Sequence, residues 1–454
     1  MADPNTNDEV PLGWPGQLWL EGRTLVHLQN EQERPSHMPR GPAKRTGVGF
    51  LNPAMAPART RSVLLLADAL EHGWLVKPDR PIRALDALCA TGVRIRRWRN
   101  EIPSDLQHRL RITGNDLDEF ALSWAKTSHH CHPPKRDVEH EPEDDRHGQP
   151  SDAVFTNGLH FQRLDARMAM VDAAYQWVDL DPFGSPIQFL DAALQSLSRT
   201  GVLEVTATDT AALTGSSPSS QARRYQAKGL VDEYAHDDAV RLLLGTVATT
   251  AARLDKVVTP LLALFDGHHV RISLLVKTSK SEARKIRDSI GWRVRCEDVP
   301  YRFVHHPAPD QLKAASGPMW IGPMWHHGIA SRMTEERALD LCHPTEDEIQ
   351  SHRAQGLQWS DEDTNHSARE LRRSVRYIAD AAELMSREHL LLNLDALPRL
   401  AGVGGAPKME KLLSALVEAG YAAARYPDLE PMLVTDAPFE SVMEVVRMCH
   451  ASTD

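Results

Sequence analysis

The feature that most constrains the fold is a regular alternation of strand-like and helix-like segments between residues 81 and 279. Short apolar runs end in polar turns, and each is followed by a segment with apolar residues at helical spacing. This alternation predicts an α/β fold with a doubly wound, mostly parallel sheet. The last run, LLALFDGHHVRISLLVKTS (261–279), reads as a hairpin that adds an antiparallel edge to the sheet.

The chain of 454 residues is long enough for two domains with extensions. Residues 1–45 are predicted to be an N-terminal extension, flexible apart from a possible hairpin at QLWLEGRTLVHL (17–28). Residues 46–290 are predicted to form the alternating domain, which carries an acidic insertion at 137–152. A helical pattern then predicts a second, smaller, helix-rich α+β domain over 291–454, with a wing-like hairpin at its end.

Local signals set the boundaries of several elements. Asn52 and Pro53 are a helix start, and Gly73 is a natural stop for that helix. The run GVLEVTATD (201–209) is predicted to be a strand, and DEDTNHSARELRRSVRYIADAAELM (361–385) is predicted to be one helix.

The composition is that of an intracellular protein. Apolar residues make up 41% of the chain and charged residues 25%, and no run approaches the roughly 18 apolar residues that a membrane helix needs. The polar, acidic N-terminus is unlike a signal peptide, so a cytoplasmic location is expected. The five cysteines form no C-x-x-C pair, which argues against a disulfide framework or zinc knuckle. The run His129, His130, Cys131 and His132 reads more simply as a solvated loop than as a metal site, so no metal is predicted.

The charge is distributed unevenly. The net charge of −10 argues against a protein that coats nucleic acid nonspecifically. Each basic cluster by itself reads as a solvated face, but four of them in an acidic chain favour a polyanionic partner. The clusters are Arg94, Arg96, Arg97 and Arg99; Arg223, Arg224 and Lys228; Lys277, Lys280, Arg284, Lys285 and Arg287; and Arg369, Arg372, Arg373 and Arg376.

Acidic residues recur at the ends of successive predicted strands, where ligands bind in such sheets. They are Asp86, Asp116, Asp165 and Asp181. Asp116 follows the second strand, where a carboxylate takes the ribose hydroxyls of a nucleoside, and Asp165 with Ala166 follows the third strand, where the adenine edge lies. Each acid alone also fits a helix cap or a turn. The first strand leads into CATG rather than the G-x-G-x-x-G fingerprint of dinucleotide sites, which favours S-adenosylmethionine as the cofactor.

The stretch DLDPFG (179–184) suits methylation of an exocyclic amine on a nucleobase. Such an amine is a poor nucleophile, and its N–H protons need acceptors before the nitrogen can attack a methyl group. The carboxylate of Asp181 and the carbonyl of Pro182 are such acceptors, and Phe183 offers a ring on which an extruded base stacks. The alternative is an ordinary β-turn followed by a core phenylalanine.

With these motifs in order, the chain resembles the archaeal and eukaryotic tRNA (guanine-N2)-dimethyltransferases that act on guanosine 26. The matching segments run from about residue 46 to the C-terminus: FLNPAMAPAR (50–59), DALCATGVR (86–94), NDLD (115–118), DAR (165–167), DLDPFGSP (179–186), VTATDTAALTG (205–215), GPMWIGP (317–323) and VTDAP (434–438). The resemblance implies a class I Rossmann-like methyltransferase domain and a C-terminal tRNA-binding domain.

The resemblance also implies roles for single residues. Arg59 and Arg94 would hold S-adenosylmethionine, Asp116 its ribose, and Asp165 and Ala166 its adenine. The catalytic residues would be Asp181, Pro182 and Phe183. The chain departs from the family pattern at Ala58 and Thr60, which flank Arg59, and at Ile95, which takes a glycine position.

The expected activity is transfer of one and then a second methyl group to N2 of guanosine 26 in tRNA. The alternatives are an amino-methyltransferase acting on another RNA base, a small-molecule methyltransferase, and a noncatalytic RNA-binding subunit with the methyltransferase fold. No DNA or membrane partner is expected, and a monomer is favoured.

Overall fold

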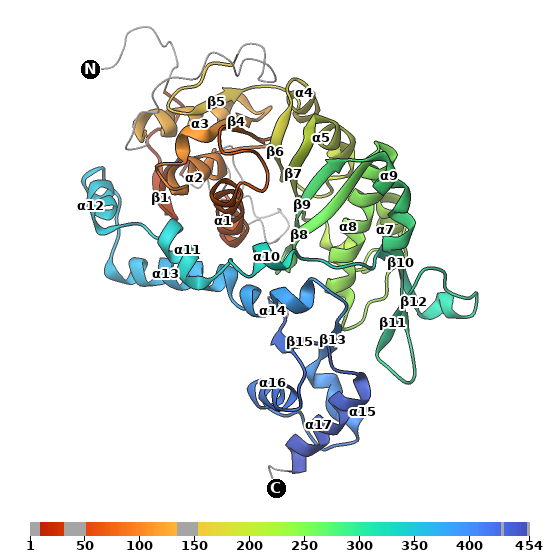
Figure 1. Cartoon of the computed structure of the whole chain (residues 1–454). Coiled ribbons are helices and arrows are strands. Elements are labelled where there is room, and N and C mark those ends of the chain that lie inside the picture. The colour runs from red at the N-terminus through yellow and green to blue at the C-terminus, as the bar shows by residue number, and fades with distance from the viewer. Residues whose placement is uncertain (1–9, 31–50, 134–152, 428–430, 452–454) are drawn as a thin grey trace, which may run out of the picture. The chain divides into compact units, whose positions relative to one another are not determined.

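The computed structural model describes residues 10–30, 51–133, 153–427 and 431–451 (Figure 1). It divides into two compact units that interleave along the chain. The first contains residues 1–181, 191–204 and 335–374, and the second contains 182–190, 205–334 and 375–454. The domains predicted from the sequence differ from these units, because each predicted domain is one continuous stretch of the chain. The predicted boundaries stay a prediction.

The central sheet confirms the predicted α/β class. Its seven strands have the order β5-β4-β3-β6-β7-β9-β8. Strand β3 pairs in parallel with β4 and β6, β4 pairs in parallel with β5, and β8 and β9 form the predicted antiparallel hairpin. The bounds are β3 (Ile82–Asp86), β4 (Leu110–Asn115), β5 (Leu159–Gln162), β6 (Tyr175–Leu180), β7 (Leu197–Ala207), β8 (Lys256–Asp266) and β9 (His269–Thr278).

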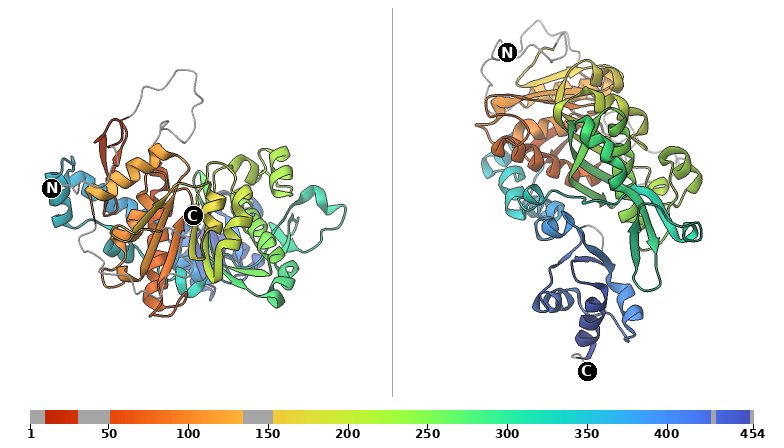
Figure 2. Two further views of the ribbon diagram at one scale, coloured as in Figure 1. Left: turned by 90° about the horizontal axis from the view of Figure 1, so that it is seen from above. Right: turned by 45° about the vertical axis from the view of Figure 1, so that its right-hand side comes forward.

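Helices of the first unit lie on both sides of its strands, as a doubly wound sheet requires (Figure 2). Asn52 accepts a hydrogen bond from Ala54 N–H ahead of a short 3-10 turn (Pro53–Met55), and Gly73 ends the first helix in the left-handed conformation with φ 63°. Both predicted boundaries of this helix are therefore confirmed. The helices are α1 (Ala56–His72), α2 (Val93–Glu101), α3 (Glu119–Cys131), α4 (Ala166–Val171) and α5 (Leu190–Ser196).

The predicted N-terminal hairpin is also present, as β1 (Gln17–Glu21) and β2 (Thr24–Leu28). Every residue of β2 is buried. Val26 packs with Val93 of α2, and Leu25 packs with Leu357. The hairpin is thus part of the core of the first unit. Most other residues of the predicted extension, and the acidic insertion, lie outside the described residues.

Three helices that the sequence assigns to the C-terminal domain belong to the first unit: α11 (Glu335–Cys342), α12 (Glu346–Ala354) and α13 (Asp361–Val375). Arg61 on α1 donates to the carbonyl of Ser374 at 2.8 Å, and Arg23 pairs with Glu348 at 2.7 Å. The single helix predicted over 361–385 is wrong, because Tyr377 adopts φ 65° and separates α13 from α14 (Ile378–Met385).

The second unit contains a small antiparallel sheet of order β11-β10-β12 that the sequence pattern did not predict. Arg293 in β10 is fully buried because Asp238 and Asp232 neutralise it, at 2.7 and 2.9 Å. A buried arginine hides the apolar alternation on which strand prediction depends. The elements are α6 (Thr210–Leu213), α7 (Pro218–Tyr225), α8 (Ala235–Arg253), α9 (Lys280–Ala283), β10 (Ile290–Arg295), β11 (Tyr301–Val304), β12 (Ala315–Trp320) and α10 (His327–Ala330).

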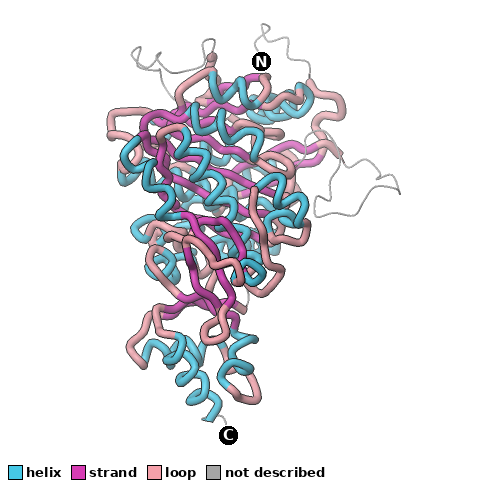
Figure 3. Tube along the Cα trace, turned by 90° about the vertical axis from the view of Figure 1, so that its right-hand side faces the viewer, coloured by secondary structure: helices cyan, strands magenta, loops and turns pink. Residues whose placement is uncertain are grey.

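The C-terminal part of the second unit has a hydrophobic core that includes Leu392, Leu412, Leu433 and Val446. Its sheet has the order β13-β15-β14, and the β14–β15 pair is antiparallel like the predicted wing. Figure 3 shows helices around the C-terminus beside these strands. The elements are β13 (Leu390–Asn393), α15 (Leu397–Ala401), α16 (Met409–Glu418), β14 (Ala423–Arg425), β15 (Met432–Thr435) and α17 (Phe439–Ala451).

Candidate active site

Three carboxylates gather at the carboxyl ends of the neighbouring strands β3 and β6. Asp86 is the last residue of β3 and pairs in register with Asp179 of β6, and both are almost completely buried. Asp181 follows two residues after Asp179, with 19% of its side chain exposed. The sequence predicted Asp86 and Asp181 here. The sequence analysis did not single out Asp179, because this residue lies within the apolar run of the predicted strand rather than after its end.

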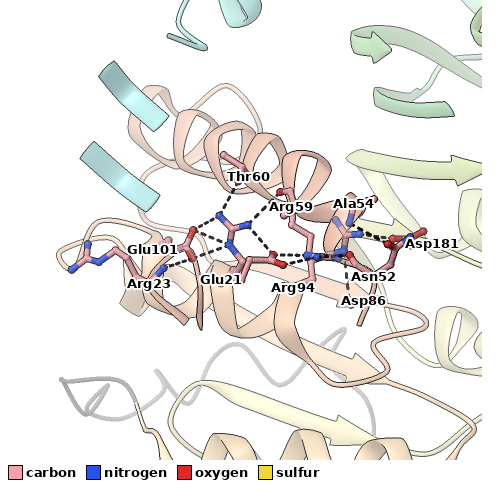
Figure 4. A network of polar contacts seen from close by, with 12 residues as sticks. Glu21, Arg23, Asn52, Ala54, Arg59, Thr60, Asp86, Arg94, Glu101 and Asp181 are labelled. Carbon is pink, nitrogen blue, oxygen red and sulfur yellow. Dashed lines mark hydrogen bonds and ion pairs between the residues drawn. The ribbon is translucent and has the colours of Figure 1, made fainter. Parts of the chain in front are cut away.

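Arg94, on the first turn of α2, holds these carboxylates together (Figure 4). Its Nη2 donates to Asp181 at 2.6 Å, and its Nε lies 3.4 Å from Asp179 Oδ1 and 3.8 Å from Asp86 Oδ2. Its Nη1 is buried and has no hydrogen-bond partner among the described residues. A buried guanidinium nitrogen without an acceptor is costly, so this atom points to a ligand acceptor such as a carboxylate.

The electrostatics of the cluster favour a cationic ligand. Burial raises the pKa of Asp86 to about 8, the nearby Asp179 adds to the rise, and Arg94 opposes it. Three carboxyl groups around one guanidinium leave the ends of β3 and β6 acidic overall. An acidic edge beside one unsatisfied arginine nitrogen suits a molecule that carries both a positive centre and a carboxylate.

Asp116 connects the ends of β3 and β4. Its Oδ2 accepts from Ala90 N–H at 2.8 Å and its Oδ1 accepts from Asp118 N–H at 2.9 Å. The loop of Ala90 is sharply turned, and Gly92 there adopts φ 70°. Each carboxylate oxygen has two lone pairs, so Asp116 retains acceptor capacity for ribose hydroxyls.

Asn115, which the sequence analysis did not single out, fixes the surrounding loops. It is fully buried, and its amide donates to the carbonyls of Ala87 and Leu164 at 3.0 Å each. Its Oδ1 accepts from Leu164 N–H at 3.0 Å. One side chain therefore links the loops that follow β3 and β5. The NDLD motif was the available signal, but only its acid was interpreted.

Asp165 and Ala166 lie where β5 leads into α4, as predicted. Asp165 caps α4 by accepting from Arg167 N–H at 2.9 Å, and it pairs with the Arg167 side chain at 2.8 Å. These bonds lower the pKa of Asp165 to about 2. Ala166 is buried. The position agrees with the prediction, and the role in adenine binding stays a prediction.

Arg59 is paired inside the protein. Its Nε and Nη2 each donate to a different oxygen of Glu21 at 2.6 Å, and its Nη2 also donates to the Asn52 carbonyl at 2.9 Å. Figure 4 shows Arg59 with Glu21 and Asn52, and Arg94 with Asp86 and Asp181, in one close view. Glu21 lies in the segment that the sequence assigned to an extension, so its link to Arg59 was missed.

The loop after Asp181 exposes the predicted stacking ring. Pro182 is buried, whereas Phe183 is 80% exposed. Gly184, at φ 76°, donates to Thr208 Oγ1 at 2.7 Å and accepts from Thr208 N–H at 2.9 Å. The DPFG and TATD motifs are therefore joined by two hydrogen bonds. The alternative of a core phenylalanine is wrong for this loop.

The same two motifs are linked by side chains. Tyr225 of α7 donates to Asp209 at 2.7 Å and lies 3.2 Å from the hydroxyl of Ser185. Arg224 pairs with Asp209 at 2.9 Å. These bonds hold the loop on which Phe183 is displayed.

The basic clusters differ in exposure. The predicted surface character of the first cluster is wrong, because Arg94, Arg96, Arg97 and Arg99 of α2 are all buried. Residue spacing alone did not reveal their internal partners. The other three clusters are exposed: Arg223, Arg224 and Lys228; Lys277, Lys280, Arg284, Lys285 and Arg287; and Arg369, Arg372, Arg373 and Arg376.

Neither a metal-binding cluster nor a membrane-spanning helix occurs in the part of the chain that the structure describes. It contains no group of three or more histidine, cysteine or acidic side chains placed to hold a metal ion. His132 instead lies 2.7 Å from His27, and His129 bonds to the carbonyl of Thr156. No helix there has the length and apolar character needed to cross a membrane.

Comparisons with known proteins agree with this geometry. The family model described as N2,N2-dimethylguanosine tRNA methyltransferase matches residues 42–447. The tRNA (guanine(26)-N(2))-dimethyltransferase of Thermococcus kodakarensis is 29% identical over 403 residues, covering 88% of this chain and 93% of the relative. The tRNA (guanine(26)-N(2)/guanine(27)-N(2))-dimethyltransferase of Aquifex aeolicus is 28% identical over 298 residues, covering 63% and 69%.

Among solved structures, Trm1 from Pyrococcus horikoshii in complex with S-adenosyl-L-methionine superposes with a TM-score of 0.68. It is 25% identical and covers 95% of this chain and 99% of its own. The methyltransferase fold and the resemblance found in the sequence are thereby confirmed. The chain belongs to the N2,N2-dimethylguanosine tRNA methyltransferase family.

Proposed function

We propose that this protein transfers methyl groups from S-adenosylmethionine to the exocyclic N2 of guanosine 26 in tRNA, giving N2-methylguanosine and then N2,N2-dimethylguanosine. The observation that carries the proposal is the buried Nη1 of Arg94, which has no acceptor among the residues that the structure describes, while the same side chain holds Asp181. This supports a site in which an arginine donor for the ligand lies next to the acceptor for the base amine.

The residues fit the cofactor. When bound, S-adenosylmethionine supplies an electrophilic methyl group on a sulfonium. Arg94 and Arg59 hold its carboxylate, and a guanidinium is suited to that geometry. Asp116 accepts from the ribose hydroxyls, while Asp165 and Ala166 border the adenine. Asp179, which pairs in register with Asp86, adds negative charge at the strand ends and stabilises the positive sulfonium.

Asp181 prepares the amine for attack. Its carboxylate is held by Arg94 at 2.6 Å, so it is oriented before the base arrives. The carboxylate accepts a hydrogen bond from one N–H of the guanine amine, and the Pro182 carbonyl accepts a hydrogen bond from the other N–H. As the nitrogen bonds to the methyl carbon, the bond between that carbon and the sulfonium sulfur would break and leave S-adenosylhomocysteine. The proton released from the nitrogen passes to Asp181. The second transfer uses the one N–H that remains.

Phe183 receives the base. A guanine inside folded tRNA must leave its stack to reach the site, and the exposed ring of Phe183 offers a new stacking surface. The three exposed basic clusters are suited to the tRNA backbone. We expect the C-terminal domain to bind tRNA, the protein to act as a monomer, and its location to be the cytoplasm.

A second candidate position is guanosine 27, because the relative from Aquifex aeolicus is named for both positions. The test is nucleoside mass spectrometry of unmodified tRNA transcripts after incubation with the protein and S-adenosylmethionine. We expect N2,N2-dimethylguanosine that disappears when guanosine 26 is replaced by adenosine. Product that persists there and disappears only when guanosine 27 is replaced would favour the second candidate. Absence of methylated guanosine in every transcript would overturn the proposal.

A further inference from the structure

Glu21, the last residue of β1, forms the most extensive set of bonds to Arg59. Its two oxygens accept from Arg59 Nε and Nη2 at 2.6 Å each (Figure 4). Its Oε1 also accepts from Arg97 Nη1 at 3.1 Å. The side chain is 7% exposed. Burial alone would raise the pKa of Glu21, but Arg59 and Arg97 lower it below its usual value, so the carboxylate stays charged.

The network continues to α2 and the hairpin turn. Arg97 pairs with Glu101 at 2.8 Å and donates to Thr60 at 3.0 Å. Two arginines and two glutamates thus form a charge-balanced, buried cluster. A Cβ at Gly22, where φ is 57°, would lie 2.2 Å from Glu101 Oε1. Glycine therefore lets the turn approach the cluster closely enough to insert Glu21.

This arrangement fixes the direction of the Arg59 guanidinium. The Nε and Nη2 donors are used by Glu21, and Nη2 also bonds to Asn52. Nη1 donates to none of the residues that the structure describes. An arginine side chain has much rotamer freedom, and a bidentate carboxylate removes most of it. The guanidinium is held with one nitrogen, Nη1, and its two N–H groups left for a ligand.

We propose that Glu21 is a positioning residue that orients Arg59 toward the carboxylate of the bound cofactor. The N-terminal hairpin would then contribute Glu21 to the cofactor site. The inference rests on the role of Arg59 in the proposed function. A competing arrangement, in which Glu21 occupies Arg59 and must be displaced by the cofactor carboxylate, predicts the opposite change in affinity.

Two ligands separate these cases. S-adenosylhomocysteine carries the amino-acid carboxylate, whereas 5′-methylthioadenosine has the same adenosine and thioether without it. For Glu21→Gln we expect the affinity for S-adenosylhomocysteine, measured by isothermal titration calorimetry, to fall about 10-fold or more, since a charge-assisted hydrogen bond is lost. The affinity for 5′-methylthioadenosine should change less than about twofold, because no carboxylate is involved.

The matched control is Glu282→Gln, which removes an exposed ion pair with Lys285 and should leave both affinities unchanged. Glu21→Asp keeps the charge but shortens the reach, and we expect an intermediate loss. In an Arg59→Ala background, Glu21→Gln should have no further effect on S-adenosylhomocysteine, because its effect passes through Arg59.

Equal losses for both ligands would assign Glu21 a general structural role and overturn the inference. Tighter binding of S-adenosylhomocysteine by Glu21→Gln would overturn it in favour of competition, and a wild-type protein that binds neither ligand would remove its basis. Wild-type protein that binds S-adenosylhomocysteine but methylates no tRNA would refute the proposed function alone. If Glu21→Gln does not fold, Glu21→Asp provides the same comparison.

Discussion

Arg94 and Arg97 are both buried on α2, yet their surroundings are opposite in character. Arg97 is matched by Glu21, Glu101 and Thr60, and no atom of its guanidinium lacks a partner among the described residues. Arg94 faces three carboxylates with two of its nitrogens, and its third nitrogen has no partner in the described ranges of the chain.

The difference separates a scaffold from a binding site. A balanced, fully bonded cluster stabilises one arrangement of the hairpin, α1 and α2. An unbalanced cluster with a buried donor left over is unfavourable until a ligand completes it. We therefore expect two arginines on one helix to serve two purposes: Arg97 to maintain the fold and Arg94 to serve the proposed reaction.

The largest expected effect comes from Asp181→Asn, which keeps the side-chain shape but removes the charge that Arg94 holds. Methyl transfer to tRNA should fall about 10³-fold, within the range for loss of a general base. Affinity for S-adenosylhomocysteine should change less than about threefold, because Asp181 serves the base amine. Single-turnover rates with radiolabelled cofactor would measure the first quantity, and calorimetry the second. Retained turnover would contradict the catalytic assignment.

Matched lysine substitutions test the comparison directly. Arg97→Lys loses the forked bonds to Glu21 and Glu101, and we expect the free energy of unfolding to fall by about 3 kcal/mol, as for other broken buried pairs. Arg94→Lys keeps one charge near the three carboxylates, so its stability should fall by about 1 kcal/mol or less, while affinity for S-adenosylhomocysteine falls about 10-fold.

Urea denaturation and calorimetry on both variants check these values. The reverse pattern, with Arg94→Lys the less stable variant and Arg97→Lys the weaker binder, would break the division between scaffold and site.

The sequence predicted the strand-end acids because they depend on local order. A strand, a turn and a helix follow one another, and the parallel arrangement brings Asp86, Asp116 and Asp181 to one edge of the sheet. It did not predict partners that are distant in the chain. Glu21 and Arg59 meet only after folding.

Buried charge explains the remaining errors. Strand β10 was not predicted because Arg293 gives it a charged residue at a buried position. The acids that neutralise Arg293, Asp232 and Asp238, lie in an earlier segment of the chain. The arginines of α2 suggested a surface because spacing carries no information about internal acceptors. The turn at Tyr377 was missed because its left-handed conformation is uncommon for a tyrosine.

Phe183→Ala tests base binding separately from the comparison of Arg94 with Arg97, because it changes neither arginine. Loss of a stacking surface costs about 1–3 kcal/mol per base, so tRNA methylation should fall about 10- to 100-fold. Affinity for S-adenosylhomocysteine and the free energy of unfolding should stay close to wild type, because the ring is 80% exposed. Phe183→Tyr keeps an aromatic face and should retain most activity. A large loss of stability in Phe183→Ala would show that the ring belongs to the core.

The smallest expected effect concerns the acidic group around Arg94 and depends on pH. Burial, with Asp179 nearby, raises the pKa of Asp86 to about 8, so this carboxyl is neutral in the folded protein over a range where it is ionised in the unfolded chain. In that range the unfolded state binds fewer protons, and stability falls as pH rises. The stabilising contribution is complete below the unfolded pKa and is lost as pH approaches 8.

Asp86→Asn removes this titration while keeping a neutral, hydrogen-bonding side chain. Between pH 6 and 8 the wild type should lose about 2 kcal/mol of unfolding free energy more than the variant. Urea midpoints at pH 6, 7 and 8 measure the difference, and Glu282→Gln is the control for surface carboxylates. Parallel pH profiles would mean that Arg94 keeps Asp86 ionised. The cluster around Arg94 would then carry one more negative charge than it does with a neutral Asp86. It would differ more from the charge-balanced cluster around Arg97, and its preference for a cationic ligand would be stronger.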